Sequence, residues 1–287
     1  GVAFIVSEIS GVNLSQNLLL LKVRPSVKFT RLSLDVGSET LDIEENLGIT
    51  QIEDLWVPIK PFERSLDWIE KQDLKAWLVD STPLTVVGAG LAGVEIVLAL
   101  RKRWTRRPLQ LQANLSQLNF QLKSALSAAG IALIPSGKRI TGPALFCIGS
   151  KSPEWLKKSG LPVGSSGRVL TTETLQVIGC PNLFAVGDCG VIQKNFLPPS
   201  GVWAVRAAKP LARNLERSSH NLKLLPWRPQ RRALQLMGGH TKSTPFVAWA
   251  FWGELVLGPH PWLWKLKEVI DRRFMSKFEV VPIMRDV

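Results

Sequence analysis

The sequence has no tyrosine, only three cysteines and no long apolar run. Cys147, Cys180 and Cys189 are too few and too scattered for a disulfide framework or a zinc site, and no two of them form a C-x-x-C pair. No apolar stretch approaches the roughly 18 residues of a membrane-spanning helix. The start of the chain also shows no signal-peptide pattern. We therefore expect a cytoplasmic protein without a metal site.

Positive charge is what the sequence has in excess. The net charge is +13 over 287 residues, and the tail from Ala204 onward holds 15 Lys or Arg against 6 Asp or Glu. Such a balance fits nucleic acid, an anionic membrane surface or a solvated face. No zinc-finger, helix-turn-helix or RNA-binding signature is present, so we do not expect a nucleic-acid partner. With 45% hydrophobic residues, the chain can bury a core and hold two domains.

The stretch "TVVGAGLAGVE" (85–95) reads as a strand, a glycine turn and the start of a helix. Its glycines have the G-x-G-x-x-G spacing: the first permits the turn, the second lets a pyrophosphate approach and the third lets the helix pack closely. They are Gly88, Gly90 and Gly93. The ligand's negative charge would lie at the positive end of the helix. The pattern predicts a dinucleotide-binding turn, and a purely structural turn is the alternative.

Strands and helices alternate after this turn, which predicts a parallel sheet and an α/β fold. We expect strands at 108–112 and 131–135 and a helix at 118–129. Two later strands also end in glycine, at Gly149 and at Gly187-Asp188. A carboxylate at that position either accepts hydrogen bonds from ligand hydroxyls or caps the following helix.

Several stretches resemble a known family. "TVVGAGLAGVE", "CIGSKSPEWLKKSGL" and "TLQVIGCPNLFAVGDCG" are similar to the FAD-dependent pyridine nucleotide oxidoreductases of the type II NADH dehydrogenase kind. The tail stretches "AVRAAKPLARNLER", "LLPWRPQRRALQLM" and "WLWKLKEVIDRRFM" resemble the NADH-dehydrogenase-like module that is fused to selenide, water dikinase.

The resemblance implies an α/β fold in which a Rossmann-like NAD(P)-binding domain is inserted into a split FAD-binding domain. The FAD-binding halves would be 1–79 and 149–217, the NAD(P)H-binding domain 80–148, and a basic, Trp-rich C-terminal cap 218–287. The family's first glycine motif, which holds the ADP half of FAD, would precede residue 1. We therefore expect the FAD-binding domain to be incomplete here, with sequence upstream of Gly1.

The resemblance also implies the cofactor-binding residues. Gly88, Gly90 and Gly93 would hold the pyrophosphate of NAD(P)H, and Glu95 would lie near the nicotinamide. The alternative for Glu95 is a helix-start acid worth about 0.3–1 kcal/mol. The residues expected beside FAD are Gly149, Gly187 and Asp188, together with Asp35 and Gly37 of "LSLDVGS".

The implied function is an oxidoreductase that passes hydride from NAD(P)H to FAD and then to an unknown acceptor, such as a quinone. Because the cofactors perform this chemistry, no catalytic side chain is expected. The alternative is a non-catalytic nucleotide-sensing module attached to a selenide, water dikinase. An NAD-specific site places an acid about 20 residues after the glycine turn, but this chain has "QAN" at 112–114. The sequence therefore leaves the choice between NADH and NADPH open.

The tail predicts a basic amphipathic helix near 265–278. Apolar residues recur every four positions from Leu266 through Ile270, Phe274 and Phe278, with Lys and Arg largely between them. Such a helix either closes the protein's own core or lies in a membrane interface. We expect a core cap, with Ile270 and Phe274 buried.

Overall fold

The computed structural model describes residues 2–44, 54–76, 82–230, 232–240, 246–253 and 255–278. The chain forms two compact units. The first unit comprises residues 1–41 and 150–231, and the second comprises 42–149 and 232–287. The boundary expected after residue 79 lies outside the described residues. The boundary expected after 217 falls inside helix α6 (Gly201–Ser219) of the first unit.

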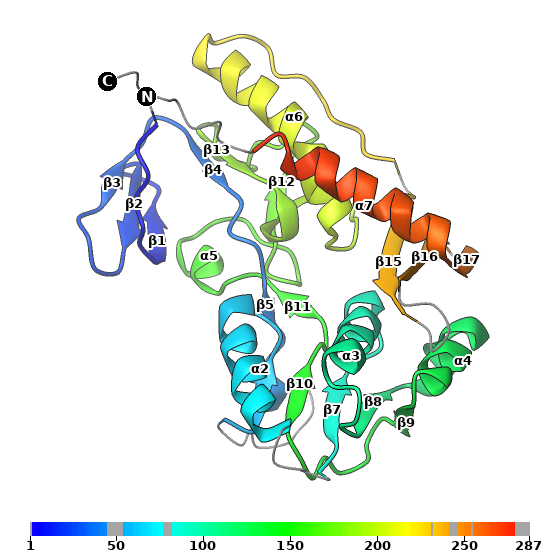
Figure 1. The fold of residues 1–287 in the computed structure, drawn as a ribbon. Helices are drawn as coiled ribbons and strands as arrows, with labels where there is room; N and C mark the ends of the chain where they lie inside the picture. Colours follow the sequence, from blue (N-terminus) through cyan, green and yellow to red (C-terminus); the bar gives the residue numbers. More distant parts are fainter. Residues whose placement is uncertain are drawn as a thin grey trace, which may run out of the picture. The chain divides into compact units, whose positions relative to one another are not determined.

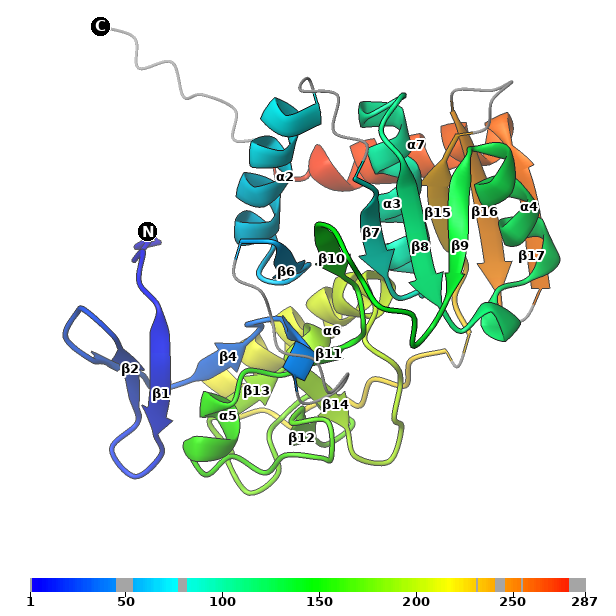
Figure 2. The same cartoon turned by 90° about the horizontal axis from the view of Figure 1, so that it is seen from below.

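The second unit is built on a parallel sheet of five strands in the order β6-β10-β7-β8-β9. Figure 1 labels β10, β7, β8 and β9, and Figure 2 also labels β6. Its strands are β6 (Trp56–Pro58), β7 (Leu84–Val87), β8 (Leu109–Ala113), β9 (Ile131–Pro135) and β10 (Ala144–Phe146). The helices that alternate with them are α2 (Phe62–Ala76), α3 (Leu91–Arg103) and α4 (Phe120–Ala128). The expected α/β organisation is confirmed.

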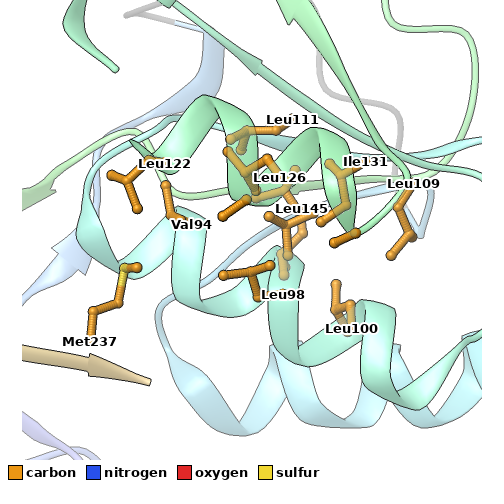
Figure 3. Close-up of a cluster of buried hydrophobic side chains, with 14 of the residues drawn as sticks. Val94, Leu98, Leu100, Leu109, Leu111, Leu122, Leu126, Ile131, Leu145 and Met237 are labelled. Carbon is orange, nitrogen blue, oxygen red and sulfur yellow. The ribbon is translucent and has the colours of Figure 1, made fainter. Parts of the chain in front are cut away.

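Helix α3 is apolar over most of its length because it packs on two sides. It contacts β7 and β8 of the parallel sheet and also β15 (Gln235–Gly239) near the C-terminus. Val94 and Leu98 are fully buried, and Figure 3 shows Met237 of β15 beside them. The surrounding core combines side chains of the sheet, α3 and α4: Leu100, Leu109, Leu111, Leu122, Leu126, Ile131 and Leu145.

The C-terminal segment adds a second, antiparallel sheet to this unit. Strand β15 pairs with β16 (Val247–Trp252), which pairs with β17 (Leu255–His260), and helix α7 (Pro261–Met275) packs on them. Figure 2 shows these strands beside α7.

The buried face of α7 differs from the one that the sequence predicts. Leu263 is buried at 1% exposure, whereas Ile270 is 48% exposed and Phe274 is only partly buried. The expectation that Ile270 and Phe274 are buried was wrong, because the described contacts place the first turn of α7, not its second half, on the sheet.

The first unit combines short strands with helices α5 (Trp155–Lys158) and α6. Strands β1 (Ile9–Asn13), β2 (Leu18–Leu21) and β3 (Val27–Lys28) form an antiparallel sheet. The remaining strands pair two by two: β4 (Leu32–Leu34) with β13 (Leu183–Ala185), β5 (Glu39–Thr40) with β11 (Ser150–Lys151), and β12 (Val169–Thr171) with β14 (Gly190–Ile192). The β4–β13 pair is parallel, so both strands end at the same edge. No helix among the described residues has the length and apolar character needed to cross a membrane.

Candidate functional site

The glycine turn joins β7 to α3 as the sequence predicts, and its three glycines differ in their surroundings. Gly88 has φ +105°, and a side chain there would also collide with the carbonyl of Cys147. A side chain at Gly93 would collide with the carbonyl of Gly88, so the helix packs closely against the turn. Around Gly90, by contrast, no atom beyond its two chain neighbours lies within 4 Å of where a side chain would begin. The structure thus leaves open space at the glycine where the sequence predicts the approach of a pyrophosphate.

The N-terminus of α3, which is the positive end of the helix dipole, has no side-chain cap. Gly90 is the N-cap residue, so no side chain caps the helix, and its first turn contains no acid. The first N–H groups of a helix lack partners within the helix and attract anions. This end of α3 therefore suits the phosphates of a dinucleotide.

Glu95 has a contact that sequence reasoning missed. Its Oε1 accepts a hydrogen bond of 3.0 Å from the backbone N–H of Gly238 in β15. A side chain at Gly238 would approach Trp264 to 2.7 Å, so the strand comes close to its neighbours at this glycine. Glu95 joins α3 to the C-terminal sheet, and its place near a nicotinamide stays a prediction.

The carboxyl end of β10 lies beside the glycine turn. Phe146 is paired with Val87, and the Cys147 N–H donates to the Val87 carbonyl at 2.7 Å. Gly149 follows with φ +101°, a conformation that favours glycine. Burial raises the pKa of the Cys147 thiol to about 12. The thiol is therefore protonated at neutral pH and unsuited to nucleophilic work.

Several cations precede β8 in the sequence, namely Arg101, Lys102, Arg103, Arg106 and Arg107. The contacts of two of them lie at the opposite end of the sheet from the glycine turn. Arg101 donates to the carbonyl of Gly130, just before β9, and to those of Trp104 and Thr105. Arg103 pairs with Asp73 of α2. These contacts place Arg101 and Arg103 away from the edge that carries the glycine turn.

The first unit brings four of the residues expected beside FAD together. Because β4 and β13 run parallel, Asp35 and Gly37 after β4 lie at the same edge as Gly187 and Asp188 after β13. A side chain at Gly187 would collide with the Asp35 carboxylate. Gly37 and Gly187 both have positive φ, +69° and +64°. The Ser38 hydroxyl donates to Asp188 at 2.9 Å.

The negative charge of Asp188 acts on the titration of Asp35. The pKa of Asp35 is raised, first by desolvation and then by the negative charge of Asp188. Such a pair repels phosphate and suits ligand hydroxyls, to which a carboxylate offers hydrogen-bond acceptors.

Arg168 is a residue of this edge that the sequence did not indicate. Its guanidinium donates to the carbonyls of Asp188 at 3.0 Å, Leu197 at 2.6 Å and Gly190 at 2.5 Å. It thereby fixes the turn that carries Asp188. A small cavity of about 40 Å³ adjoins this turn, and Trp203 and Trp227 are among the residues that line it. The cavity has room for ordered water.

No protein-family model matches the chain, and no curated protein matches it in sequence. Solved structures do match. The reduced CoADR-RHD protein of Bacillus anthracis is 17% identical, with a TM-score of 0.61 and coverage of 92% of this chain and 49% of that one. The NADH-bound water-forming NADH oxidase of Lactobacillus brevis is 15% identical, with a TM-score of 0.63 and coverage of 85% and 58%.

The sulfide:quinone oxidoreductase of Aquifex aeolicus is 14% identical, with a TM-score of 0.68 and coverage of 96% of this chain and 75% of that one. The chain shares the mixed α/β fold of these three solved structures. It spans about half the length of the first two of these proteins. At 14–17% identity the likeness establishes the fold alone.

Proposed function

We propose that this chain is part of an NAD(P)H-dependent flavoprotein oxidoreductase. The observation that carries the proposal is the glycine turn after β7. Gly88 and Gly93 have no room for a side chain, whereas Gly90 faces open space at the uncapped start of α3. A structural turn needs the first two features but not the third. The open space at the positive end of a helix is what a dinucleotide pyrophosphate requires.

The residues at the edge of the first unit have the chemical groups that a flavin cofactor needs. Asp35 and Asp188 offer acceptors for ribityl hydroxyls, and Gly37 and Gly187 keep the backbone turns narrow. The positive charge of Arg168 offsets part of the negative charge of Asp188, and its guanidinium hydrogen-bonds the backbone carbonyl of Asp188. We propose that FAD binds along this edge. The expected role of Gly149, which belongs to the second unit, stays a prediction.

Bound NAD(P)H would supply a hydride, and bound FAD would supply the redox chemistry toward an acceptor. The role of the residues at the two edges would be to bind these cofactors and to orient them. The Cys147 and Cys189 thiols stay protonated because burial raises their pKa values to about 12 and about 11. We therefore assign no catalytic side chain and propose no thiol chemistry. The acceptor is left open, and none of the similar structures supports the expected link to selenide, water dikinase.

The glycine turn gives the test. The protein is mixed anaerobically with FAD, which is kept in excess, and then with NADH or NADPH. We expect the flavin absorbance to bleach, and Gly90→Val to slow this bleaching by about a hundredfold because the side chain blocks the pyrophosphate. Gly90 has φ −60° and ψ 166°, which valine adopts readily, so the variant should keep its melting temperature.

Two controls separate the outcomes of this test. Dithionite should still bleach the flavin of the Gly90→Val protein, since it needs no dinucleotide site. Gly93→Ala should instead lower the melting temperature, because its methyl group meets the Gly88 carbonyl. Equal NAD(P)H bleaching in wild type and Gly90→Val would place the dinucleotide elsewhere. Failure of NAD(P)H to bleach the flavin in the presence of the wild-type protein would contradict the proposal.

A further inference from the structure

The carboxyl ends of three neighbouring strands form a continuous edge in the second unit. The Gly88 N–H donates to the Gln112 carbonyl at 2.8 Å, and the Ser136 N–H donates to the Ala113 carbonyl at 2.9 Å. The edge therefore runs from the glycine turn, across the end of β8, to the loop after β9. A dinucleotide with its pyrophosphate at the start of α3 places its adenosine ribose at the end of β8.

This edge has no carboxylate for ribose hydroxyls. No aspartate or glutamate occurs anywhere between Glu95 and Glu154 in the sequence. Gln112 is buried, and its amide donates to the carbonyls of Lys138 at 2.6 Å and Pro135 at 3.4 Å. The Asn114 side chain is exposed and caps the short helix η1 (Leu115–Gln117) by accepting from the Ser116 N–H. The acid that marks NAD-specific sites is therefore absent.

Two cations lie at the same edge instead. Lys138 and Arg139 follow β9, and the hydrogen bond from Gln112 to the Lys138 carbonyl ties their loop to the end of β8. Both side chains are exposed, and neither forms an ion pair with any residue that the structure describes. Neighbouring cations repel each other and lower their energy by binding an anion. The anion that distinguishes NADPH from NADH at this position is the 2′-phosphate of the ribose.

We propose that the site selects NADPH over NADH and that Lys138 and Arg139 bind the 2′-phosphate, a selectivity that rests on the proposed function of the glycine turn. The ordinary alternative is a solvated basic loop with no ligand. The two differ in one measurable respect, because a solvated loop would not distinguish nucleotides by a single phosphate at a fixed position.

The test uses calorimetric titration of the 287-residue chain with adenosine 2′,5′-bisphosphate and with AMP, which differ only in the 2′-phosphate. We expect the bisphosphate to bind about tenfold more tightly, in keeping with charge-assisted hydrogen bonds. Lys138→Ala and Arg139→Ala should each remove most of this difference and leave AMP binding unchanged. Arg106→Ala is the matched control, since this exposed arginine precedes β8 at the opposite end of the strand.

A second variant tests the same inference by charge. Asn114→Asp keeps the cap of η1, because aspartate accepts the same hydrogen bond, but adds a carboxylate at the ribose. It should weaken NADPH binding and strengthen NADH binding, each by several fold. Equal binding of the two adenosine nucleotides, or no effect of Lys138→Ala and Arg139→Ala, would overturn the inference and leave the proposed function standing. Failure of both NADH and NADPH to bind would overturn both.

Discussion

At the scale of the residue, the paired carboxylates of the first unit show how a site residue can oppose folding. Asp35 keeps contact with solvent, yet its surroundings raise its pKa above 3.8, through desolvation and the charge of Asp188. A folded state that holds an acid's proton more tightly than the unfolded state loses stability as pH rises through the raised pKa. Proteins commonly accept such costs at functional positions.

We therefore expect Asp35→Asn to stabilise the protein at neutral pH, because it removes the charge that the fold disfavours. The free energy of unfolding of the variant minus that of wild type should be smallest below pH 3.8, grow as pH rises through the folded pKa and then stay constant. Denaturant melts at several pH values measure this difference. Asp188→Asn should lower the Asp35 pKa in an NMR titration. A stability difference that shrinks as pH rises would contradict the assignment.

The glycine turn and the β8 edge differ in how far sequence could predict them. Gly88 and Gly93 must be glycines because a side chain there would meet the turn itself or the neighbouring strand. Their spacing in the sequence is therefore enough to predict the turn. Lys138 reaches the end of β8 through a hydrogen bond from Gln112, 26 residues earlier. Arg168 likewise acts on Asp188, 20 residues away. Such placements depend on strand pairing, which one sequence does not specify.

At the scale of the element, the C-terminal helix shows where periodicity succeeds and where it fails. The pattern of Ile270, Phe274 and Phe278 correctly predicts a helix, but it does not tell which turn meets the core. Leu263, at the start of α7, packs with Ala248 and Ala250 of β16. The tertiary contacts decide the buried face, and they involve strands that the sequence analysis did not predict.

The resulting prediction contrasts two apolar residues of one helix. Leu263→Ala should cost about 2–5 kcal/mol of unfolding free energy, because it loses buried surface and leaves a cavity. Ile270→Ala should cost less than about 1 kcal/mol, since the residue is 48% exposed. Urea unfolding of both variants checks the contrast. A larger loss for Ile270→Ala would mean that this helix face is covered in solution.

The strands before α7 were missed for a physical reason. "VAWAF" (247–251) is buried at every position, so it lacks the alternation that marks a half-exposed strand. A continuous apolar run of this length fits a buried strand or a piece of a buried helix equally well. By contrast, the predicted strand at 131–135 coincides with β9, since it stands between clear helix and loop signals.

At the scale of the whole chain, the order of the sequence hides which segments form one core. Residues 232–287 follow the first unit but belong to the second, where β15 covers the side of α3 that faces away from the parallel sheet. Met237, Trp249 and Phe251 share one apolar core with Val94 and Leu98. Helix α3, which carries the third glycine of the turn, packs against both the parallel sheet and β15. The glycine turn therefore depends on the C-terminal segment of the chain.

Removal of residues 232–287 should therefore unfold the second unit and abolish binding of NADPH and NADH, while the first unit, which keeps all of 1–41 and 150–231, retains its own core. Calorimetric melting of the shortened chain should lack one transition of the full chain. Met237→Ala offers a milder version: with 1% exposure it should cost about 2–5 kcal/mol and lower the melting temperature of that same transition. Leu156→Ala, in the core of the first unit, is the matched control and should shift the other transition. If the shortened chain still bound NADPH with wild-type affinity, the C-terminal sheet would be an appendage rather than part of the nucleotide-binding core.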